Sequence, residues 1–269
     1  MNDEPITDSF NRYFSLTEPR TPEEREAAYR LRYEVYCREF QFEREEDCPG
    51  QREADAYDDQ SWHCLLRHIP SAFAAGSVRV VHVDADDPIP DLPMERNCRD
   101  SFFDVPQRPD RLDRGSICEV SRLAVHGLFR RRAGEQVSPI GDPAALDLTP
   151  EQTRVFPILA VSLFVAATVV CVRENKRHAF AMMEPALARI LRRTGLEFTQ
   201  IGAKVDYHGE RAAFYIDSGE AHASLMRSES LGPLCTRLES SLDGGTEASA
   251  PAGPRQARDW RHRSGQRAA

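Results

Sequence analysis

The sequence lacks the short motifs that identify several large enzyme classes. It has no HExxH metal motif, no GxSxG nucleophile, no Walker loop and no GxGxxG loop. Its seven cysteines include no CxxC pair and no short metal-ligand spacing, and no Cys–His signature accompanies them. These absences argue against zinc-motif proteases, serine hydrolases of that type, P-loop enzymes and covalent catalysis by cysteine. They also predict that no metal is bound tightly.

Other absences concern the environment of the chain. The N-terminus, MNDEPITDSF, is acidic and polar, which does not fit a secretory signal. An odd number of scattered cysteines fits reduced thiols in a cytoplasm better than a disulfide framework. The net charge is −8, and residues 1–60 account for the whole acidic excess, so general attraction to nucleic acid is not expected.

Only one long hydrophobic run occurs, at residues 155–172, and it is close to the length that spans a bilayer. Pro157 interrupts the run, Ser162 and Thr168 are polar, and no second span follows. A helix that is apolar all round is also typical of a helix that covers a central sheet. We therefore predict a buried core helix and no transmembrane segment.

The remaining pattern alternates between helices and strands. A capping box formed by Thr21 and Glu24 starts a helix over residues 21–40. Further elements are predicted as strands at 61–69, 76–86, 117–125 and 178–183, a helix at 184–195, and strands at 196–202 and 211–217. This order predicts a mixed α/β domain with at least one crossover helix around a largely antiparallel sheet. The expected organisation is an N-terminal extension at 1–19, one domain at 20–241 and a disordered tail at 242–269.

The strand at 117–125 carries polar residues that a half-buried strand rarely contains. Alternation places Glu119 and Ser121 on one face and Arg122 on the opposite face, unless a bulge intervenes. Glu119 beside apolar neighbours should have a raised pKa, which suits a general base. The alternative is a structural ion pair at the edge of the sheet.

Two further pairs of charged residues complete the candidates. Asp55 and Asp58 lie in a loop, where such carboxylates bind a metal, hold an amine or cap a turn. Arg32 lies on the first helix, and Arg79 lies inside an apolar strand. A buried arginine needs a carboxylate partner, because an unpaired buried charge costs several kcal/mol. Asp55, Asp58 and Glu119 are the predicted partners.

A basic turn, LFRRRAG, follows the Glu119 strand at residues 128–134. Backbone NH groups together with Arg130, Arg131, Arg132 and Gly134 would form a cradle for a phosphate group. A solvated basic turn is the alternative interpretation.

Four segments, YRLRYEVYCREFQFE, DAYD, GSVRVV and EVSRLAV, together resemble the acyl-homoserine lactone synthases of the Gcn5-related N-acetyltransferase (GNAT) superfamily. The charged residues of that family correspond here to Arg32, Asp55, Asp58, Arg79, Glu119 and Arg122. The later segment MEPALARILRRTGLEFTQIGAKVDYHGERAAFYID is more similar to long-chain N-acyl amino acid synthases and to acyltransferases associated with PEP-CTERM/exosortase systems. Phe40 or Phe42 stands where autoinducer synthases place a tryptophan.

The resemblance implies a GNAT-like α/β fold, with a mixed, mostly antiparallel, splayed sheet flanked by helices. It implies an N-acyltransferase that moves a fatty acyl group from a phosphopantetheine thioester to an amine such as an amino acid. The donor would be an acyl carrier protein or CoA, and the thioester would not be a tightly bound cofactor. An acidic carrier would dock on the arginines at 130–132, together with Arg192 and Arg193, while the helix at 155–172 would line the acyl channel.

The resemblance also implies roles for individual residues. Glu119 would accept the amine proton, and Asp55 would be the carboxylate that touches an ammonium group. Asp55 and Asp58 would pair with Arg32, Arg79 and Arg122 and order the loop over the acceptor, so the expected catalytic residues are Glu119, Arg122, Asp55 and Asp58. The residues expected to bind substrate are Arg32, Arg79, Ser121, Phe40 and Phe42. The alternatives are a signal synthase that uses S-adenosylmethionine, a non-catalytic acyl-carrier or lipid-binding module, and a metal-dependent hydrolase using Asp55, Asp58 and Glu119.

Overall fold

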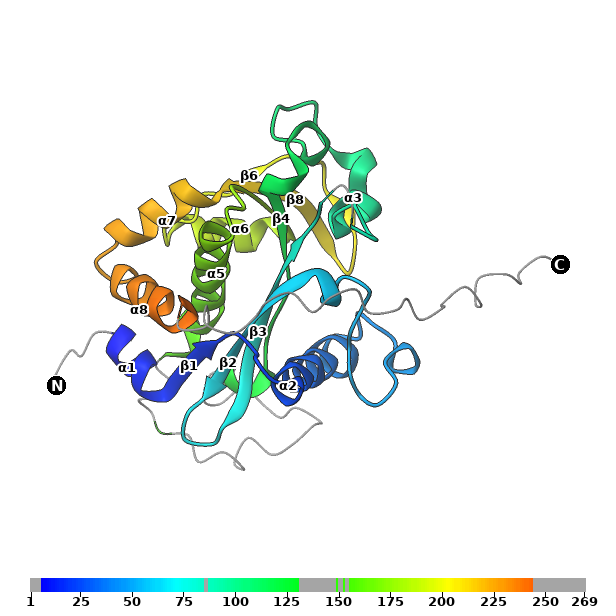
Figure 1. Cartoon of the computed structure of the whole chain (residues 1–269). Helices are drawn as coiled ribbons and strands as arrows, with labels where there is room; N and C mark the ends of the chain where they lie inside the picture. The colour runs from blue at the N-terminus through cyan, green and yellow to red at the C-terminus, as the bar shows by residue number, and fades with distance from the viewer. Residues whose placement is uncertain (1–5, 85–86, 131–148, 150–151, 153–154, 244–269) are drawn as a thin grey trace.

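The computed structural model describes residues 6–84, 87–130, 149, 152 and 155–243. This part of the chain folds around an eight-stranded sheet in the order β1-β2-β3-β4-β5-β8-β6, with β7 paired to β8 (Figure 1). The strands are β1 (Phe14–Thr17), β2 (Ser61–His68), β3 (Phe73–His82), β4 (Ile117–Val125), β5 (His178–Met183), β6 (Thr199–Gln200), β7 (Val205–Asp206) and β8 (Glu210–Asp217).

Every strand pair is antiparallel except the central pair of β4 and β5. That parallel pairing joins Ile117–Glu119 to residues 178–180 only, although β4 and β5 both continue beyond it. The two strands therefore separate after Glu119, and the sheet opens at its centre. This arrangement confirms the predicted mixed, mostly antiparallel, splayed sheet.

Helices cover both faces of the sheet. They are α1 (Ile6–Tyr13), α2 (Pro22–Tyr33), α3 (Pro93–Cys98), α5 (Phe156–Arg173), α6 (Pro185–Arg192), α7 (Ser218–Arg227) and α8 (Gly232–Asp243). Helix α5 crosses one face of β3 and β4 and is itself packed by α7 and α8, whereas α2 lies against β3 from the other face (Figure 1).

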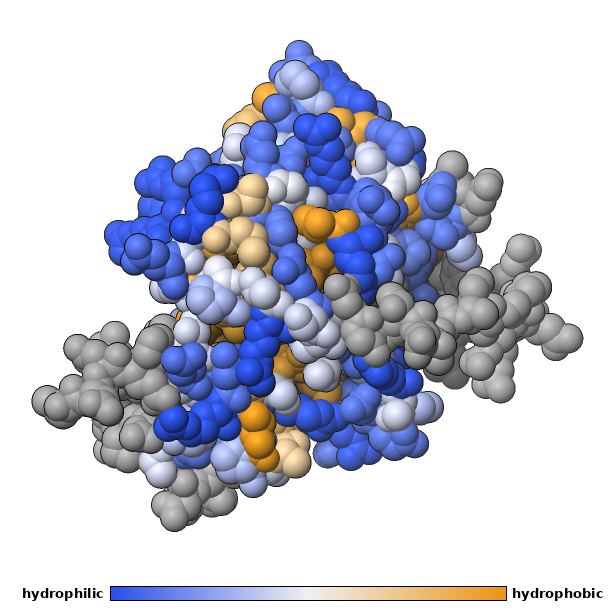
Figure 2. Space-filling model, turned by 60° about the vertical axis from the view of Figure 1, so that its left-hand side comes forward, coloured by the Kyte–Doolittle hydropathy of each residue, from blue (hydrophilic) through white to orange (hydrophobic). Residues whose placement is uncertain are grey.

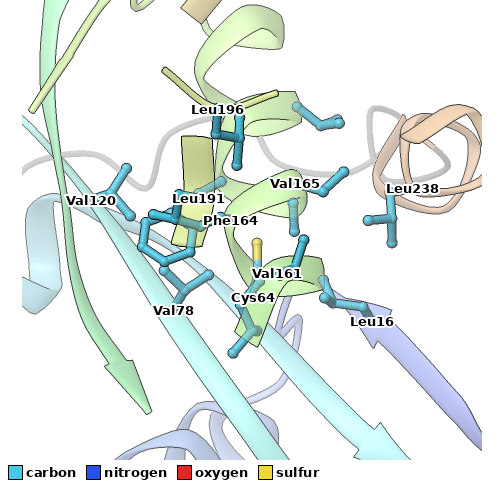
Figure 3. Close-up of a cluster of buried hydrophobic side chains, with 14 of the residues drawn as sticks. Leu16, Cys64, Val78, Val120, Val161, Phe164, Val165, Leu191, Leu196 and Leu238 are labelled. Carbon is cyan, nitrogen blue, oxygen red and sulfur yellow. The ribbon is translucent and has the colours of Figure 1, made fainter. Parts of the chain in front are cut away.

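The largest core lies between the sheet and α5. Val78 of β3 and Val120 of β4 point toward Phe164 of α5, and Leu238 of α8 lies on the other side of that helix (Figure 3). Among the described residues, α5 is the one helix long and apolar enough to cross a membrane by length and composition alone, and 67% of it is buried within the fold. Core helices of globular proteins reach the same length and hydropathy. Because most of α5 is buried in the main core, the predicted core helix is confirmed.

Outside this core, the face of the molecule in Figure 2 shows hydrophobic residues as separate areas among hydrophilic ones.

Some elements differ from the sequence prediction. The segment predicted as an N-terminal extension contributes β1 to the sheet edge, and Phe10 and Phe14 are buried in the main core. Helices α7 and α8 were not predicted, although Leu234, Leu238 and Leu242 of α8 recur at helical spacing and are buried, as is Leu231 just before it. The strand predicted at 196–202 is reduced to the two residues of β6.

Candidate active site

A β-bulge in β4 decides where Arg122 points. Ser121 lies opposite Arg79, but Ala124 lies opposite Ser77, so β4 carries one more residue than β3 across this interval. Arg122 takes up the extra residue with a φ of 49°, in the left-handed region. The bulge turns Arg122 to the side of Ser121, because Arg79 contacts both Ser121 and the carboxylate of Asp55 that Arg122 also reaches. Simple alternation, which placed Arg122 on the face away from Glu119 and Ser121, is therefore wrong here, and the bulge that the sequence analysis named as the exception is present.

The C-terminal end of α2 has an unusual conformation and contacts the bulge. The predicted helix 21–40 is an α-helix only to Tyr33 and continues as a π-helix over Glu34–Glu39. Wider π turns often accompany functional sites. Here the turn brings Tyr36 to β4, where its hydroxyl donates a hydrogen bond of 2.7 Å to the carbonyl oxygen of Leu123.

Three arginines converge with four carboxylates beneath this helix end; we call the group the charged cluster. Arg32 pairs with Glu53 and, at 2.6 Å, with Asp58. Arg79 pairs with Asp55 at 2.5 Å and with Asp58 at 2.9 Å. Arg122 completes the group by contacts of 3.0, 3.2 and 3.3 Å to Glu53, Asp55 and Glu43.

Burial makes these contacts obligatory. The side chains of Arg32 and Arg79 are each only 1% exposed, so removing a carboxylate would leave a buried charge unpaired. Burial works to raise the pKa of Asp58, but Arg32 and Arg79 outweigh it and hold that pKa well below its usual range. Asp55 and Asp58 also cap their own turn, because Asp58 accepts from the Asp55 NH and Asp55 from the Tyr57 NH. The predicted pairing of both aspartates with the arginines is present.

Glu119 lies apart from the charged cluster. Its carboxylate accepts a hydrogen bond of 2.8 Å from the backbone NH of Met94, at the start of α3, and the residue is 3% exposed. Burial raises its pKa from 4.5 to about 7, although the Met94 NH and the charges of Arg79 and Arg122 oppose the shift. Glu119 forms no ion pair with Arg32 or Arg79 in this part of the chain, so it is not the partner that the sequence suggested for a buried arginine.

Glu119 opens onto a small cavity of about 60 Å³, which we call the Glu119 cavity. It is lined by residues from the π turn, α3, β4, β5 and the β7–β8 hairpin: Tyr36, Phe42, Glu43, Pro93, Met94, Asn97, Glu119, Ser121, Arg122, Met182, Tyr207, His208 and Arg211. Of the predicted substrate residues, Phe42 and Ser121 line it, and Phe40 stacks on Phe42 at 5.2 Å. Arg32 and Arg79 stay behind it in the charged cluster.

The predicted phosphate cradle falls mostly outside the described residues, which include Arg130 but not Arg131, Arg132 or Gly134. Arg130 pairs with Glu39, donates to the carbonyl oxygen of Val125 at 2.6 Å, and lies over the ring of Phe40. Arg192 is exposed on α6, and Arg193 lines a second cavity of about 540 Å³ beside the start of α5.

Several residues of the site were missed by the sequence analysis. Glu43 and Glu53 complete the charged cluster, but no sequence spacing links them to arginines that lie 21 to 79 positions away. Met94 contributes a backbone NH, which any residue type except proline would supply. Arg211 follows a hairpin and reads as an ordinary exposed strand end.

The described residues contain one group of side chains that could hold a metal ion, His222, Cys235 and Glu239 between α7 and α8. It includes none of Asp55, Asp58 and Glu119. The two aspartates instead direct their oxygens at guanidinium groups. The geometry of these residues therefore gives no support to the hydrolase alternative.

Comparison with known proteins identifies the fold that carries these residues. Residues 31–138 match the family described as an acetyltransferase (GNAT) domain. No curated protein sequence matches the chain. Among solved structures, the AHL synthase LasI has a TM-score of 0.52 at 14% identity, over 79% of this chain and 93% of LasI. This is a GNAT-like fold.

Two further structures share the GNAT-like fold. BjaI, a CoA-dependent acyl-homoserine lactone synthase solved with SAM and isopentyl-CoA, has a TM-score of 0.54 at 19% identity, over 84% of this chain and 89% of its own. FeeM, an N-acyl amino acid synthase from uncultured soil microbes, has a TM-score of 0.50 at 16% identity, over 78% and 94%. The match to the acetyltransferase family supports an acyltransferase, which confirms the predicted enzyme class, and the solved structures show the fold.

Proposed function

We propose that this enzyme is an N-acyltransferase that moves a fatty acyl group from a phosphopantetheine thioester to an amine acceptor, with Glu119 as the general base. The observation that carries the proposal is a buried carboxyl group with a pKa of about 7 that faces a cavity. A base is most effective when its pKa lies near the working pH, and an ordinary surface glutamate lacks this property.

The proposed reaction is direct attack of the amine nitrogen on the thioester carbonyl carbon. Glu119 takes the proton that the nitrogen loses, the C–N bond forms, and the C–S bond breaks. The proton then passes to the departing sulfur, so that an amide and a free thiol are the products. No covalent intermediate on the enzyme is required.

The donor fits best in the opening between β4 and β5. These strands separate directly after Glu119, so a thioester lying in the opening would present its carbonyl carbon next to the base. Backbone NH and C=O groups along the edge of β4 that no longer pairs with β5 would bind the amides of the phosphopantetheine arm, and a strand NH would stabilise the oxyanion. The predicted phosphate cradle at 130–134 follows the end of β4, where the arm would leave the protein.

The charged cluster would act by positioning. Arg32 and Arg79 fix the loop that carries Asp55 and Asp58, and Arg122 ties that loop to the bulge beside Glu119. Asp55 is the more exposed of the two aspartates, at 29% of its side chain against 5%, so it is the carboxylate that an incoming ammonium group would reach.

The acyl chain would lie along α5. The second cavity, of about 540 Å³, is lined there by Pro157, Ile158 and Val161. These α5 residues form an apolar wall opposite polar residues such as Arg193, Ser224 and Arg227. Burial of each methylene against the apolar wall gains about 0.8 kcal/mol, so the length of that wall would set the preferred chain.

The proposal extends to the partner and the cellular context. An acyl carrier protein is the proposed donor partner, with CoA as the other carrier of the same arm. The seven free cysteines agree with a reducing cytoplasm. The sequence resemblance adds a link to a PEP-CTERM/exosortase system, in which a peptide terminus would be a further acceptor.

The test compares the wild type with Glu119→Gln and with Glu197→Gln, a control at an exposed glutamate that does not line the cavity. Loss of a general base should lower kcat by about 100-fold or more, while the control keeps full activity. Lipid extracts of expressing bacteria, compared by mass spectrometry, should contain amides in a series spaced by two carbons that E119Q lacks. In a purified assay, kcat/KM of the wild type should rise with pH through about 7.

A fall of less than about tenfold in correctly folded E119Q would exclude Glu119 as the base. A homoserine lactone in place of a simple amide would instead support the signal synthase alternative.

A further inference from the structure

Three side chains of types that bind metals in proteins meet between α7 and α8. His222 lies on α7, whereas Cys235 and Glu239 lie on α8, one helical turn apart and therefore on the same face of that helix. One nitrogen, one sulfur and one oxygen of these residues all lie within 4.8 Å of one another. Within the group, Nε2 of His222 is 2.6 Å from Oε1 of Glu239.

Cys235 forms the buried end of this group. Its side chain is 0% exposed, and its thiol makes no hydrogen bond within the part of the chain that the structure describes. The side chains of His222 and Glu239 are 22% and 34% exposed, so they form the open end. Core packing explains a buried cysteine, and an ion pair explains a histidine beside a glutamate. Neither explains why an unpartnered thiol lies within reach of that pair.

The distances in the group suit a tetrahedral metal ion. Zinc lies about 2.0–2.3 Å from its nitrogen, oxygen and sulfur ligands, so neighbouring ligand atoms around it are roughly 3.5 Å apart. No separation in the group exceeds that value by more than about 1.3 Å, and the contact of His222 with Glu239 is shorter than it by about 0.9 Å. Rotation of the two partly exposed side chains closes both differences without moving either helix.

The donor atoms select the kind of metal. Thiolate and imidazole ligands favour zinc, whereas Mg²⁺ and Ca²⁺ prefer oxygen ligands alone. We propose that His222, Cys235 and Glu239 bind one Zn²⁺ ion, with water in the fourth position, and that this ion fastens α8 to α7. Zinc binds a thiolate and a neutral imidazole, so binding releases the thiol proton to the solvent.

The place of the ion in the fold gives it a structural task. Helices α7 and α8 pack against each other and against α5 (Figure 1), and the turn between them supplies Ser228, Ser230 and Leu231 to the wall of the second cavity. A metal that binds only the folded chain stabilises it by mass action. The ion therefore holds together the helix pair that covers α5, and no step of the proposed reaction involves it.

Sequence spacing could not reveal this group. His222 and Glu239 are 17 positions apart, on two helices that the sequence did not predict. Zinc motifs are recognised by pairs of cysteines or histidines at short spacing, and this group has one of each. The expectation that no metal is bound tightly rested on the absence of such pairs.

The test uses the full chain, without an affinity tag and freed of metal by a chelator, and titrates it with Zn²⁺ and with Co²⁺. We expect one Zn²⁺ to bind at this group. The melting temperature should rise by about 5–10 °C at a zinc concentration about 100-fold above Kd. Bound Co²⁺ should give a sulfur-to-cobalt charge-transfer band and the intense visible absorption of a tetrahedral site, which together report the thiolate and the geometry.

The variants are His222→Gln, Glu239→Gln and Cys235→Ala, with Cys64→Ala as the matched control at a buried cysteine of β2. Each of the first three should weaken zinc binding by about 100-fold or more and remove the rise in melting temperature. C235A should also remove the charge-transfer band, whereas C64A should behave as the wild type. H222Q and E239Q change partly exposed side chains, so they test the site even if C235A does not fold.

The absence of zinc binding at micromolar concentrations would overturn the inference. Zinc binding that is equally tight in all three variants would assign the ion to another part of the chain and overturn it as well. A cobalt complex without the charge-transfer band would exclude Cys235 as a ligand, with the same consequence. These results leave the proposed acyl transfer untouched, and a failure of acyl transfer leaves the zinc site untouched.

Discussion

Burial raises the pKa of Glu119 from 4.5 to about 7, and this shift has a consequence for stability. The folded chain holds the proton more tightly than the unfolded chain, so the folded state takes up a proton between pH 4.5 and 7. The free energy of unfolding therefore falls as the pH rises through that window, by about 3 kcal/mol from this group. Glu119→Gln removes the titration and keeps an oxygen for the NH of Met94.

We therefore predict that E119Q is more stable than the wild type at pH 8, by up to about 3 kcal/mol, and that the difference disappears near pH 4.5. Urea unfolding of both proteins at a series of pH values measures it, with Glu197→Gln as the control that should match the wild type throughout. A constant difference between E119Q and the wild type at all pH values would mean that Glu119 does not titrate with a raised pKa. Such a gain in stability with a loss of turnover is typical of a functional group held in an unfavourable place.

At this scale the sequence predicted most of the charged residues but not all of their contacts. Of the six charged residues that carry the resemblance to the acyl-homoserine lactone synthases, all except Glu119 lie in the charged cluster. The rule that a buried arginine needs carboxylate partners pointed to Asp55 and Asp58. The same rule could have gone further. Three arginines need more than two carboxylates, but which acids supply the rest depends on how the 43–58 loop folds, and Glu43 and Glu53 have no pattern of their own.

Strand β3 packs very closely against α5 and β4 at Gly76. A Cβ atom at this position would lie 3.0 Å from the carbonyl oxygen of Ala124 and 3.1 Å from a methyl group of Leu163. The first contact is backbone of the neighbouring strand β4, and the second is a side chain of α5. Glycine here lets the helix approach the sheet that carries Glu119 and Arg122.

We predict that Gly76→Ala destabilises the protein by about 1–3 kcal/mol, because the added methyl group has no space. Leu163→Ala alone should cost about 2–5 kcal/mol by leaving a cavity. The double variant should lose less stability than the sum of the two single losses, by about 0.5 kcal/mol or more. The reason is that Leu163→Ala removes one of the groups that the new methyl group meets, and that methyl group fills part of the cavity. Unfolding curves of the four proteins give this coupling, and strict additivity would show that only the contact with β4 matters.

The elements that escaped prediction share one cause, which is dependence on distant partners. The capping box of Thr21 and Glu24 is a local signal, and so is Gly195 as a helix stop at the end of the predicted helix 184–195. The structure contains the capping box, and Gly195 has a positive φ of 90° shortly after α6 ends. The π turn and the β4 bulge instead exist together, joined by the hydrogen bond from Tyr36 to Leu123. Alternation along one strand cannot reveal a bulge that is set by a helix 87 residues away in sequence.

At the scale of the whole molecule, the two faces of the sheet have different tasks. Val78, Val80 and Val120 face α5 and form the core, while Arg79, Glu119 and Ser121 face the opposite side. The fold class was predictable because the order of elements and the resemblance agreed. The edges were not, because β1 and α8 bury short apolar segments that look unremarkable until the sheet and α5 are in place.

The path of the acyl chain belongs to the same scale, because it would join the opening of the sheet to α5. Val161 is buried and lines the second cavity, whereas Val172 on the same helix is 37% exposed. We predict that Val161→Phe shifts the preferred donor to shorter chains by about two carbons, since each methylene that no longer fits lowers kcat/KM by roughly fourfold.

The measurement is kcat/KM for thioesters of eight to eighteen carbons, with Val172→Phe as the matched control. Melting curves establish that both variants are folded. If V161F lowers activity equally for all chain lengths, the second cavity does not hold the acyl chain, and the opening between β4 and β5 would have to accommodate it by another route. If V172F shifts the profile as strongly as V161F, the effect arises from α5 as a whole and not from the wall of the cavity.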